Sequence, residues 1–294
     1  MPERNDDQHA DQVRERREET EREAEAAEQS LTAHEQDQAV KRQRLSALTI
    51  YAIVRREGDE ELGRPAQSLW WSGIAAGLCI SVSVVAEGAL HHLLEGYGYR
   101  PAVENLGYTF GFVLVVLSRL QLFTENTITV VLPILAGPTR RRFLAGARLW
   151  SLVFLANMAG AFLAALIISR PGVVTPEHAA AMFELSTHYI ETRGADALLL
   201  GIPAGFLIAA LVWMLPSARG AEFFIIVAFT YLIAAAGFTH VVAGAVEVFI
   251  TVLSGGVSAW SGIFQIILPT FVGNVLGGTG LFAVLAYAQV HEEM

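Results

Sequence analysis

The chain has a single cysteine, Cys79, so it cannot form an internal disulfide. It contains no nucleotide-binding loop, nucleophile triad or cluster of metal-ligating residues, which argues against an enzyme and predicts no catalytic residue, metal or cofactor. It also lacks a basic patch interleaved with aromatic residues, so nucleic-acid binding is not expected. The polar N-terminus has no apolar region of the kind found in a cleavable signal peptide.

The chain is instead rich in apolar residues, which make up 53% of its 294 positions, and its mean hydropathy is +0.44. Residues 1–46 hold 13 acidic and 8 basic residues, and so carry over half of the formal net charge of −9. We expect this extension to be a marginal or mobile charged helix, or disordered, without a packed core. Residues 47–66 are predicted to form a cytoplasmic amphipathic helix, ended by Gly58 and the charged residues after it, and a linker.

Residues 67–294 are predicted to form a six-helix channel domain, because six apolar segments approach or exceed the length of about 20 residues that a membrane-spanning helix needs. Basic residues gather on the side that holds both chain ends, most clearly at Arg140, Arg141 and Arg142. Positive charge favours the cytoplasmic side, so we expect a multi-pass protein of the cytoplasmic membrane with both termini in the cytoplasm. The predicted spans are residues 68–94, 106–135, 143–168, 197–215, 223–253 and 263–287, with a further helix at 176–188.

Polar residues interrupt the second and fifth predicted spans. Within residues 119–127, Arg119 and Glu125 lie between two apolar runs, and a charged side chain at membrane depth costs about 2.5–3.5 kcal/mol or more. Residues 236–240, which end at His240, interrupt the fifth span. Non-helical backbone inside a membrane is tolerated only when it is buried in protein or lines a water-filled cavity. Two broken helices in corresponding halves therefore predict a transport site near the middle of the membrane.

Three short matches recur in the same order in the two halves of this domain. GIAAG at 73–77 matches GIPAG at 201–205, FTE at 123–125 matches FTH at 238–240, and NMAGA at 157–161 matches NVLGG at 274–278. Each half has three spans, so the halves have opposite orientations in the membrane. The predicted fold class is an all-α membrane protein with an inverted 3+3 repeat, in which Glu125 and His240 are equivalent.

These residues resemble the formate/nitrite transporter family, from about Ser68 to the C-terminus. The stretch ENLGYTFG at 104–111, ahead of LFTENT at 122–127, is similar to the branch of the family with a charged N-terminal extension. The resemblance implies an aquaporin-like fold and a homo-pentamer with one pore per protomer. It also implies conduction of small monovalent anions or weak acids such as formate, nitrite, acetate, lactate or hydrosulfide, in some members together with a proton.

The resemblance extends to individual residues of the pore. Leu122, Phe123 and Thr124 match the loop of the family's broken second helix, and His240 matches its central histidine. Two apolar constrictions are implied, one formed by Phe112, Leu122 and Phe123 and the other including Tyr108 and Ile233.

The chain also departs from the family pattern. Members of the family usually carry a lysine in the approach to the fourth helix, but residues 187–190 contain none. Gly205 replaces the family's asparagine in that helix, and Gly244 replaces a polar residue four positions after His240. Thr239 stands where an acid is common. The intramembrane charges Arg119, Glu125 and Glu247 are additional.

A lone histidine in an apolar segment is most often a core residue, but the position of His240 in a helix break favours a central pore role, shared with Thr124 and Thr239. His240 would present a proton or hydrogen bond to the solute between the constrictions, with its tautomer fixed by Thr124. Arg119, Glu125 and Glu247 have two interpretations: a structural network whose charges neutralise one another, or functional groups that form a proton relay or a cation-attracting site. Asn126, Asn157 and Asn274 are predicted to brace the broken helices, whose free backbone groups need partners.

The sequence leaves two rival functions open. One is a neutral small-solute channel of aquaporin-like architecture, and the other is a membrane scaffold or sensor that conducts nothing. The leading prediction is a channel or proton-coupled transporter for a small monovalent anion or weak acid.

Overall fold

The computed structural model describes residues 16–17, 20, 22, 32 and 44–293, so most of the predicted charged extension lies outside the described residues. Contacts divide the chain into two units, Met1–Leu45 and Ser46–Met294. The second unit contains the predicted channel domain and the helix before it. Helices joined by turns and short irregular stretches make up its described length, and the described residues contain one isolated β-bridge, Pro171 with Val174, but no named strand.

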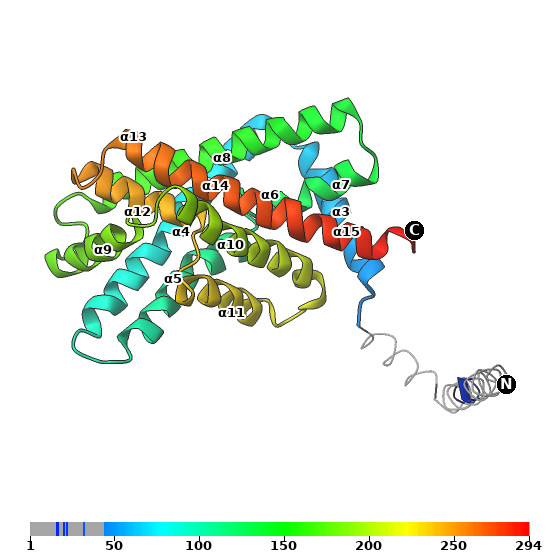
Figure 1. The fold of residues 1–294 in the computed structure, drawn as a ribbon, viewed down its shortest axis with the longest axis horizontal. Coiled ribbons are helices and arrows are strands. Elements are labelled where there is room, and N and C mark those ends of the chain that lie inside the picture. The colour runs from blue at the N-terminus through cyan, green and yellow to red at the C-terminus, as the bar shows by residue number, and fades with distance from the viewer. Residues whose placement is uncertain (1–15, 18–19, 21, 23–31, 33–43, 294) are drawn as a thin grey trace, which may run out of the picture. The chain divides into compact units, whose positions relative to one another are not determined.

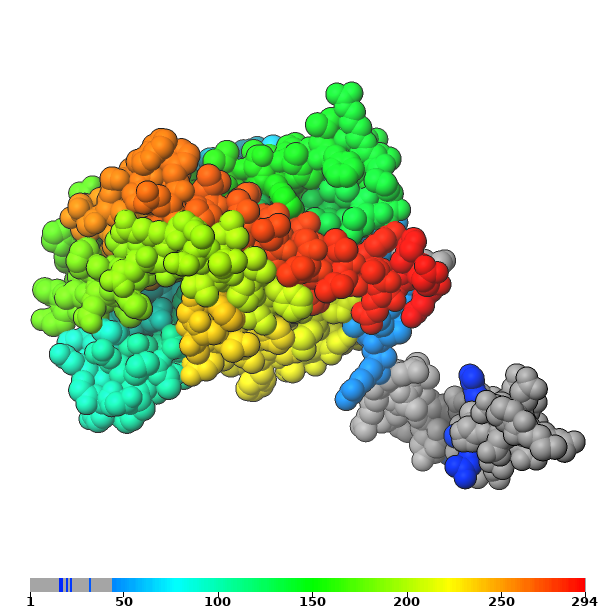
Figure 2. Space-filling model, viewed as in Figure 1, coloured from blue at the N-terminus to red at the C-terminus, as the bar shows by residue number. Residues whose placement is uncertain are grey.

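Four helical segments of this unit are long and apolar enough to cross a membrane: Ala66–Leu93, Arg140–Ile168, Ala195–Ser217 and Ala259–His291. The first two are α4 and α8, and the third begins with α10 (Ala195–Met214). The fourth joins α13 (Ala259–Ser261), α14 (Leu268–Val275) and α15 (Val284–His291) through wider π-helical turns. In Figure 1 these last three labels lie along one nearly continuous helix, coloured orange to red, and Figure 2 shows that helix on the near face.

The other two spans are broken, as predicted. The second consists of α5 (Arg100–Leu117), a non-helical stretch, and the short helices α6 (Asn126–Thr129) and α7 (Val131–Ala136). The fifth consists of α11 (Glu222–Ala235) and α12 (Val241–Leu253). Between the third and fourth spans, α9 (Pro176–Tyr189) forms close to where the sequence predicts a helix. Its N-cap is Thr175, whose hydroxyl accepts from the amide of His178.

Small residues let the long helices pack closely within each half. α4 lies along α8, and α10 lies along α14. A Cβ on Gly160 of α8 would overlap the carbonyl of Ile74, and a Cβ on Gly277, which follows α14, would overlap the carbonyl of Ile202. The same close approach therefore occurs in both halves, where it brings backbones together as small residues do in membrane proteins.

The helix before the first span is longer than the sequence suggested. α3 runs over Ala47–Leu62, starts at the N-cap Ser46 and continues through Gly58 to the C-cap Gly63. The prediction that Gly58 ends the helix was wrong, because this glycine is needed for packing. A Cβ there would overlap the carbonyl of Thr129 in α6. α3 also packs against α15, so both ends of the second unit lie on one side of it.

Candidate functional site

The two helix breaks have the same backbone geometry. After α5, Arg119 adopts a left-handed conformation with φ 53°, and the next amide donates to the carbonyl five residues earlier at 3.1 Å. After α11, Gly237 has φ 66°, and the next amide makes the same bond at 3.0 Å. A non-glycine residue with positive φ is uncommon. Arg119 therefore occupies, in one half, the position that glycine fills in the other.

One asparagine joins each break to the helices around it. In the first half, Asn157 of α8 donates to the carbonyls of Gly73 at 2.8 Å and Gln121 at 2.9 Å. Its side-chain oxygen accepts from the amide of Phe123 at 2.9 Å. The free backbone groups of the break are thus hydrogen-bonded inside the protein.

Asn274 of α14 makes the corresponding three bonds in the second half. It donates to the carbonyls of Gly201 at 2.8 Å and Thr239 at 2.9 Å, and it accepts from the amide of Val241 at 2.9 Å. Asn126 has a more local position, since its side-chain nitrogen donates to Oε1 of Gln121 across the first break at 3.1 Å.

These bonds fix which residues of the two breaks are equivalent. Gln121 is equivalent to Thr239, and Phe123 is equivalent to Val241. The left-handed residues Arg119 and Gly237 are aligned in the same way. His240 therefore corresponds to Leu122. The predicted equivalence of Glu125 and His240 was wrong. The alignment by the shared Phe-Thr sequence differs by three residues from the alignment given by the backbone of the two breaks.

His240 is fully buried where the two breaks meet. It caps α12, since its Nδ1 accepts from the amide of Ala243 at 3.2 Å, and its Nε2 lies 2.7 Å from Oγ1 of Thr124 in the other break. Because Nδ1 is an acceptor, the neutral ring carries its proton on Nε2 and donates it to the threonine. The ring of Phe112 stands edge-on to the imidazole, with centroids 4.9 Å apart.

The remaining predicted pore residues lie at different distances from this centre. Tyr108 is one turn from Phe112, with ring centroids 5.2 Å apart. Leu122 and Ile233 are both buried beside the breaks. The hydroxyl of Thr239 donates to the carbonyl of Ala197 at 2.8 Å, which attaches the break to α10.

Phe123 packs into an aromatic cluster of the surrounding helices. Its ring stacks on Phe271 of α14 at 4.9 Å between centroids and meets Phe154 of α8 edge-on at 5.3 Å. Trp150 completes the cluster, and its indole nitrogen donates to the carbonyl of Asn126 at 3.1 Å.

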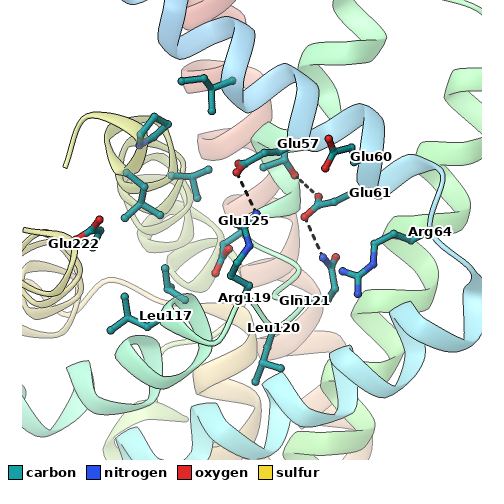
Figure 3. Close-up of a pocket in the computed structure, with 16 residues that line it drawn as sticks. Glu57, Glu60, Glu61, Arg64, Leu117, Arg119, Leu120, Gln121, Glu125 and Glu222 are labelled. Atoms are coloured by element: carbon teal, nitrogen blue, oxygen red, sulfur yellow. Dashed lines mark hydrogen bonds and ion pairs between the residues drawn. The ribbon is translucent and has the colours of Figure 1, made fainter. Parts of the chain in front are cut away.

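A cavity of about 600 Å³ opens beside the first break, on the side of the unit that carries α3. Figure 3 shows Arg119 between Glu57 of α3 and Glu125. Nη2 of Arg119 lies 3.2 Å from Oε1 of Glu57. One carboxylate oxygen of Glu125 is buried and has no hydrogen-bond partner among the described residues. The charged residues that line the cavity are Glu57, Glu60, Glu61, Glu125, Glu222, Arg64 and Arg119.

Glu61 ties α3 to the first break. Its two carboxylate oxygens accept from Nε2 of Gln121 at 3.0 Å and from the hydroxyl of Thr129 at 2.9 Å. Burial raises the pKa of the Glu61 carboxyl above its usual range, although these two hydrogen bonds act in the opposite direction.

The comparisons with known proteins agree with this architecture. The model of the formate/nitrite transporter family matches residues 48–288. The chain belongs to the formate/nitrite transporter family. It is 38% identical over 248 residues to the inner membrane protein YfdC of Escherichia coli strain K12, covering 84% of this chain and 80% of that one. It is 25% identical over 233 residues to the formate channel FocA of Haemophilus influenzae, covering 70% and 81%.

Two solved structures share the fold. A pentameric formate channel with formate bound matches with a TM-score of 0.63 and 20% identity, over 77% of this chain and 98% of that one. An FNT family ion channel matches with a TM-score of 0.65 and 22% identity, over 83% and 96%. The predicted family and all-α membrane fold are thus confirmed, and the protein is a multi-pass membrane protein of a transporter family rather than an enzyme. The family match begins inside α3, some twenty residues before the predicted resemblance.

The structure divides the predicted network of Arg119, Glu125 and Glu247. Arg119 and Glu125 line the cavity near α3, whereas Glu247 lies two turns into α12 from His240. There Glu247 interacts electrostatically with Glu87 of α4 rather than with Arg119. The sequence does not reveal which side of the breaks each of these charges faces.

Sequence reasoning missed the residues that α3 contributes to the site. Val54, Gly58 and Glu61 recur at the spacing of one helix face, and this face packs on the first break. A carboxylate at the end of an otherwise apolar and small-residue face was the available signal. His91 of α4 is also buried, and its Nδ1 lies 2.8 Å from Oε2 of Glu104.

Proposed function

We propose that this family member is a homo-pentameric channel or proton-coupled transporter, with one pore in each protomer, for a small monovalent weak acid of the formate type. The hydrogen bond between His240 and Thr124 is the observation that carries the proposal, because it joins the two broken helices at a fully buried point. Relatives named as formate channels, and a solved pentameric formate channel with formate bound, support the solute class and the assembly.

The hydrogen-bond arrangement suggests how the centre treats a solute. His240 donates the hydrogen bond to Thr124, so the threonine hydroxyl is free to donate its own hydrogen to a molecule passing the centre. A second proton on His240 would sit on Nδ1, where it would oppose the amide of Ala243 and break the cap of α12. We therefore infer that the centre offers a neutral hydrogen bond and that the transported proton travels on the solute.

The surroundings of the centre favour a neutral form of the solute. Phe112 covers the imidazole, and we assign it, Leu122 and Phe123 to one apolar constriction and Tyr108 and Ile233 to the other. Moving a bare anion past apolar groups costs a large desolvation free energy, whereas the desolvation free energy of a protonated weak acid is much smaller. The carboxylates that line the cavity beside α3 would also disfavour an anion.

We further propose that the cavity opens to the cytoplasm. α3 lines it, and α15 at the other end of the chain packs against α3, so six spans would place both termini on that side. The basic residues Arg140–Arg142 begin α8 at the same end, which fits the tendency of positive charge to remain in the cytoplasm. The lipid membrane and the solute, with a proton, are the proposed partners.

Proteoliposomes that contain the full chain test the proposal with formate, nitrite, acetate, lactate, hydrosulfide and chloride at two external pH values. We expect weak acids to enter faster at the lower pH and chloride to enter slowly at both. The carboxylates of the cavity favour one rival, a neutral-solute channel, for which water or another neutral solute would pass without weak-acid flux. Vesicles that transport none of these solutes would contradict both the weak-acid channel and the neutral-solute channel, and would favour the non-conducting membrane scaffold or sensor.

A further inference from the structure

Tyr189, at the end of α9, lies directly over the first turn of α12. A Cβ at Gly244 would overlap the hydroxyl and the adjoining ring carbons of this tyrosine, so no larger residue fits there without displacing the phenol. Gly244 is four residues after His240, and its amide donates to the carbonyl of His240 at 2.8 Å. Residues with this spacing share one helix face, so Tyr189 covers the face of α12 that begins at the central histidine.

Polar groups from three other helices lie close to the phenol, and Glu87 of α4 lies next to two of them. It interacts electrostatically with Glu247 of α12, and Tyr108 of α5 interacts with Tyr189, Glu247 and Glu87. Thr270 of α14 lies beside it, and the hydroxyl oxygen of Thr270 is fully buried without a hydrogen-bond partner among the described residues. None of these neighbours is a cation. The neighbours of the phenol are therefore carboxyl groups and neutral hydroxyls.

Aromatic contacts connect this group to the centre of the proposed pore. Tyr108 contacts Phe112, with ring centroids 5.2 Å apart, and Phe112 contacts His240 at 4.9 Å. Glu247 is seven residues along α12 from His240, which keeps it on nearly the same helix face. Tyr189 and its neighbours thus occupy the side of His240 opposite the cavity beside α3, which the first break lines.

We propose that Tyr189 is a specificity-determining residue of this outer half of the pore, and that its hydroxyl, positioned by Gly244, selects solutes in their protonated, uncharged form. The proposal rests on the function proposed above. A phenol can donate one hydrogen bond and accept others without adding charge. Beside Glu87 and Glu247 it would bind the carboxyl group of a neutral acid, whereas an anion would find no cation among these groups to offset its charge.

Three variants of the full chain, reconstituted in proteoliposomes, test the assignment with formate and chloride as probes. Tyr189→Phe keeps the ring over Gly244 and removes the donor, so we expect formate flux to fall about two- to tenfold, the range of one neutral hydrogen bond. Tyr189→Lys adds the missing cation and should raise chloride flux relative to formate. Tyr97→Phe, at an exposed tyrosine in the loop after α4, is the matched control and should leave both fluxes unchanged.

The packing of the pair has a separate readout that does not depend on transport. Gly244→Ala should lower the melting temperature of the purified protein, and Tyr189→Ala in the same chain should restore part of the loss, because the two side chains compete for one space. Additive losses would contradict the positioning by Gly244.

The outcomes separate this inference from the proposed function. Wild-type protein that carries formate, together with Tyr189→Phe protein that keeps the same rate and the same formate-to-chloride ratio, would overturn the role of Tyr189 alone. Wild-type protein that carries neither probe would overturn both. If Tyr189→Lys does not assemble, the Tyr189→Phe fluxes still decide, because that change removes one oxygen atom and keeps the ring.

Discussion

Replacing His240 separates its structural task from its proposed transport task. The imidazole uses Nδ1 to cap α12 and Nε2 to bind Thr124. Asparagine is among the best N-cap residues, so His240→Asn should keep the cap while it loses the bond to Thr124. His240→Phe keeps an aromatic ring and loses both bonds. The two variants therefore differ by one capping interaction.

The magnitudes follow from those two contacts. An N-cap side chain contributes about 0.5–2 kcal/mol and a neutral hydrogen bond about 0.5–1.5 kcal/mol. We expect His240→Asn to lower the free energy of unfolding by about 1 kcal/mol and His240→Phe by about 2–3 kcal/mol. Both should take up formate more slowly than the wild type, because neither presents a donor to Thr124 in the same place. His188→Asn, at an exposed position on α9, is the control and should change neither quantity.

Unfolding in detergent and formate uptake by proteoliposomes measure the two effects separately. If His240→Asn transports formate at the wild-type rate with the wild-type pH profile, the imidazole has no part in the mechanism. Equal stability of the two variants would instead refute the capping argument, and would leave the role in transport to be judged from the fluxes.

Three further predictions concern the supports of the site. Asn274→Leu and Asn157→Leu each remove three buried hydrogen bonds of matched geometry. Each change should therefore lower the free energy of unfolding by a similar amount, about 2–4 kcal/mol. Losses that differ severalfold would contradict the equivalence of the two halves. Gly58→Ala should destabilise the detergent-solubilised protein by about 1–3 kcal/mol or detach α3, whereas Gly63→Ala, whose nearest neighbour atom would lie 3.5 Å away, should be tolerated in the same thermal assay. Glu61 has a raised pKa, so the folded state holds its proton more tightly than the unfolded state, and stability falls as the pH rises from the usual glutamate pKa to the raised one. Chemical unfolding across that window should show a smaller decline in Glu61→Gln, and an identical decline would assign the effect to another group.

The sequence was sufficient for the architecture because membranes restrict the alternatives so strongly. Runs of apolar residues placed α4 and α8 within three residues of their observed ends. Polar residues inside the second and fifth spans located both breaks, since non-helical backbone at that depth needs protein around it. Asn157 and Asn274 could be singled out for the same reason.

The sequence was not sufficient for register or for charge partners. The short sequence match Phe-Thr aligned Glu125 with His240. The hydrogen bonds of backbone amides to the two asparagines instead align Leu122 with His240. Such backbone bonds have no fixed sequence signature. Arg119 has a pairing partner in Glu57, which is 62 residues earlier in the chain and belongs to a helix outside the predicted spans. Such a contact depends on how α3 docks, which follows from Gly58 and the shape of α6 rather than from local pattern.

The corrected register suggests where function resides in this repeat. The two halves share their asparagine bonds and the backbone path of their breaks, so the scaffold is duplicated. The residues that the breaks present are not duplicated, since one half offers the aliphatic Leu122 and the other offers His240. A second imidazole at Leu122 would be a second buried polar group in need of partners, and an unpartnered polar group in such a place costs several kcal/mol. One histidine bound to Thr124 of the opposite half avoids that cost and makes the centre directional, because the donor comes from α12 and the acceptor from the other break. The solute would then meet an asymmetric centre inside a symmetric frame.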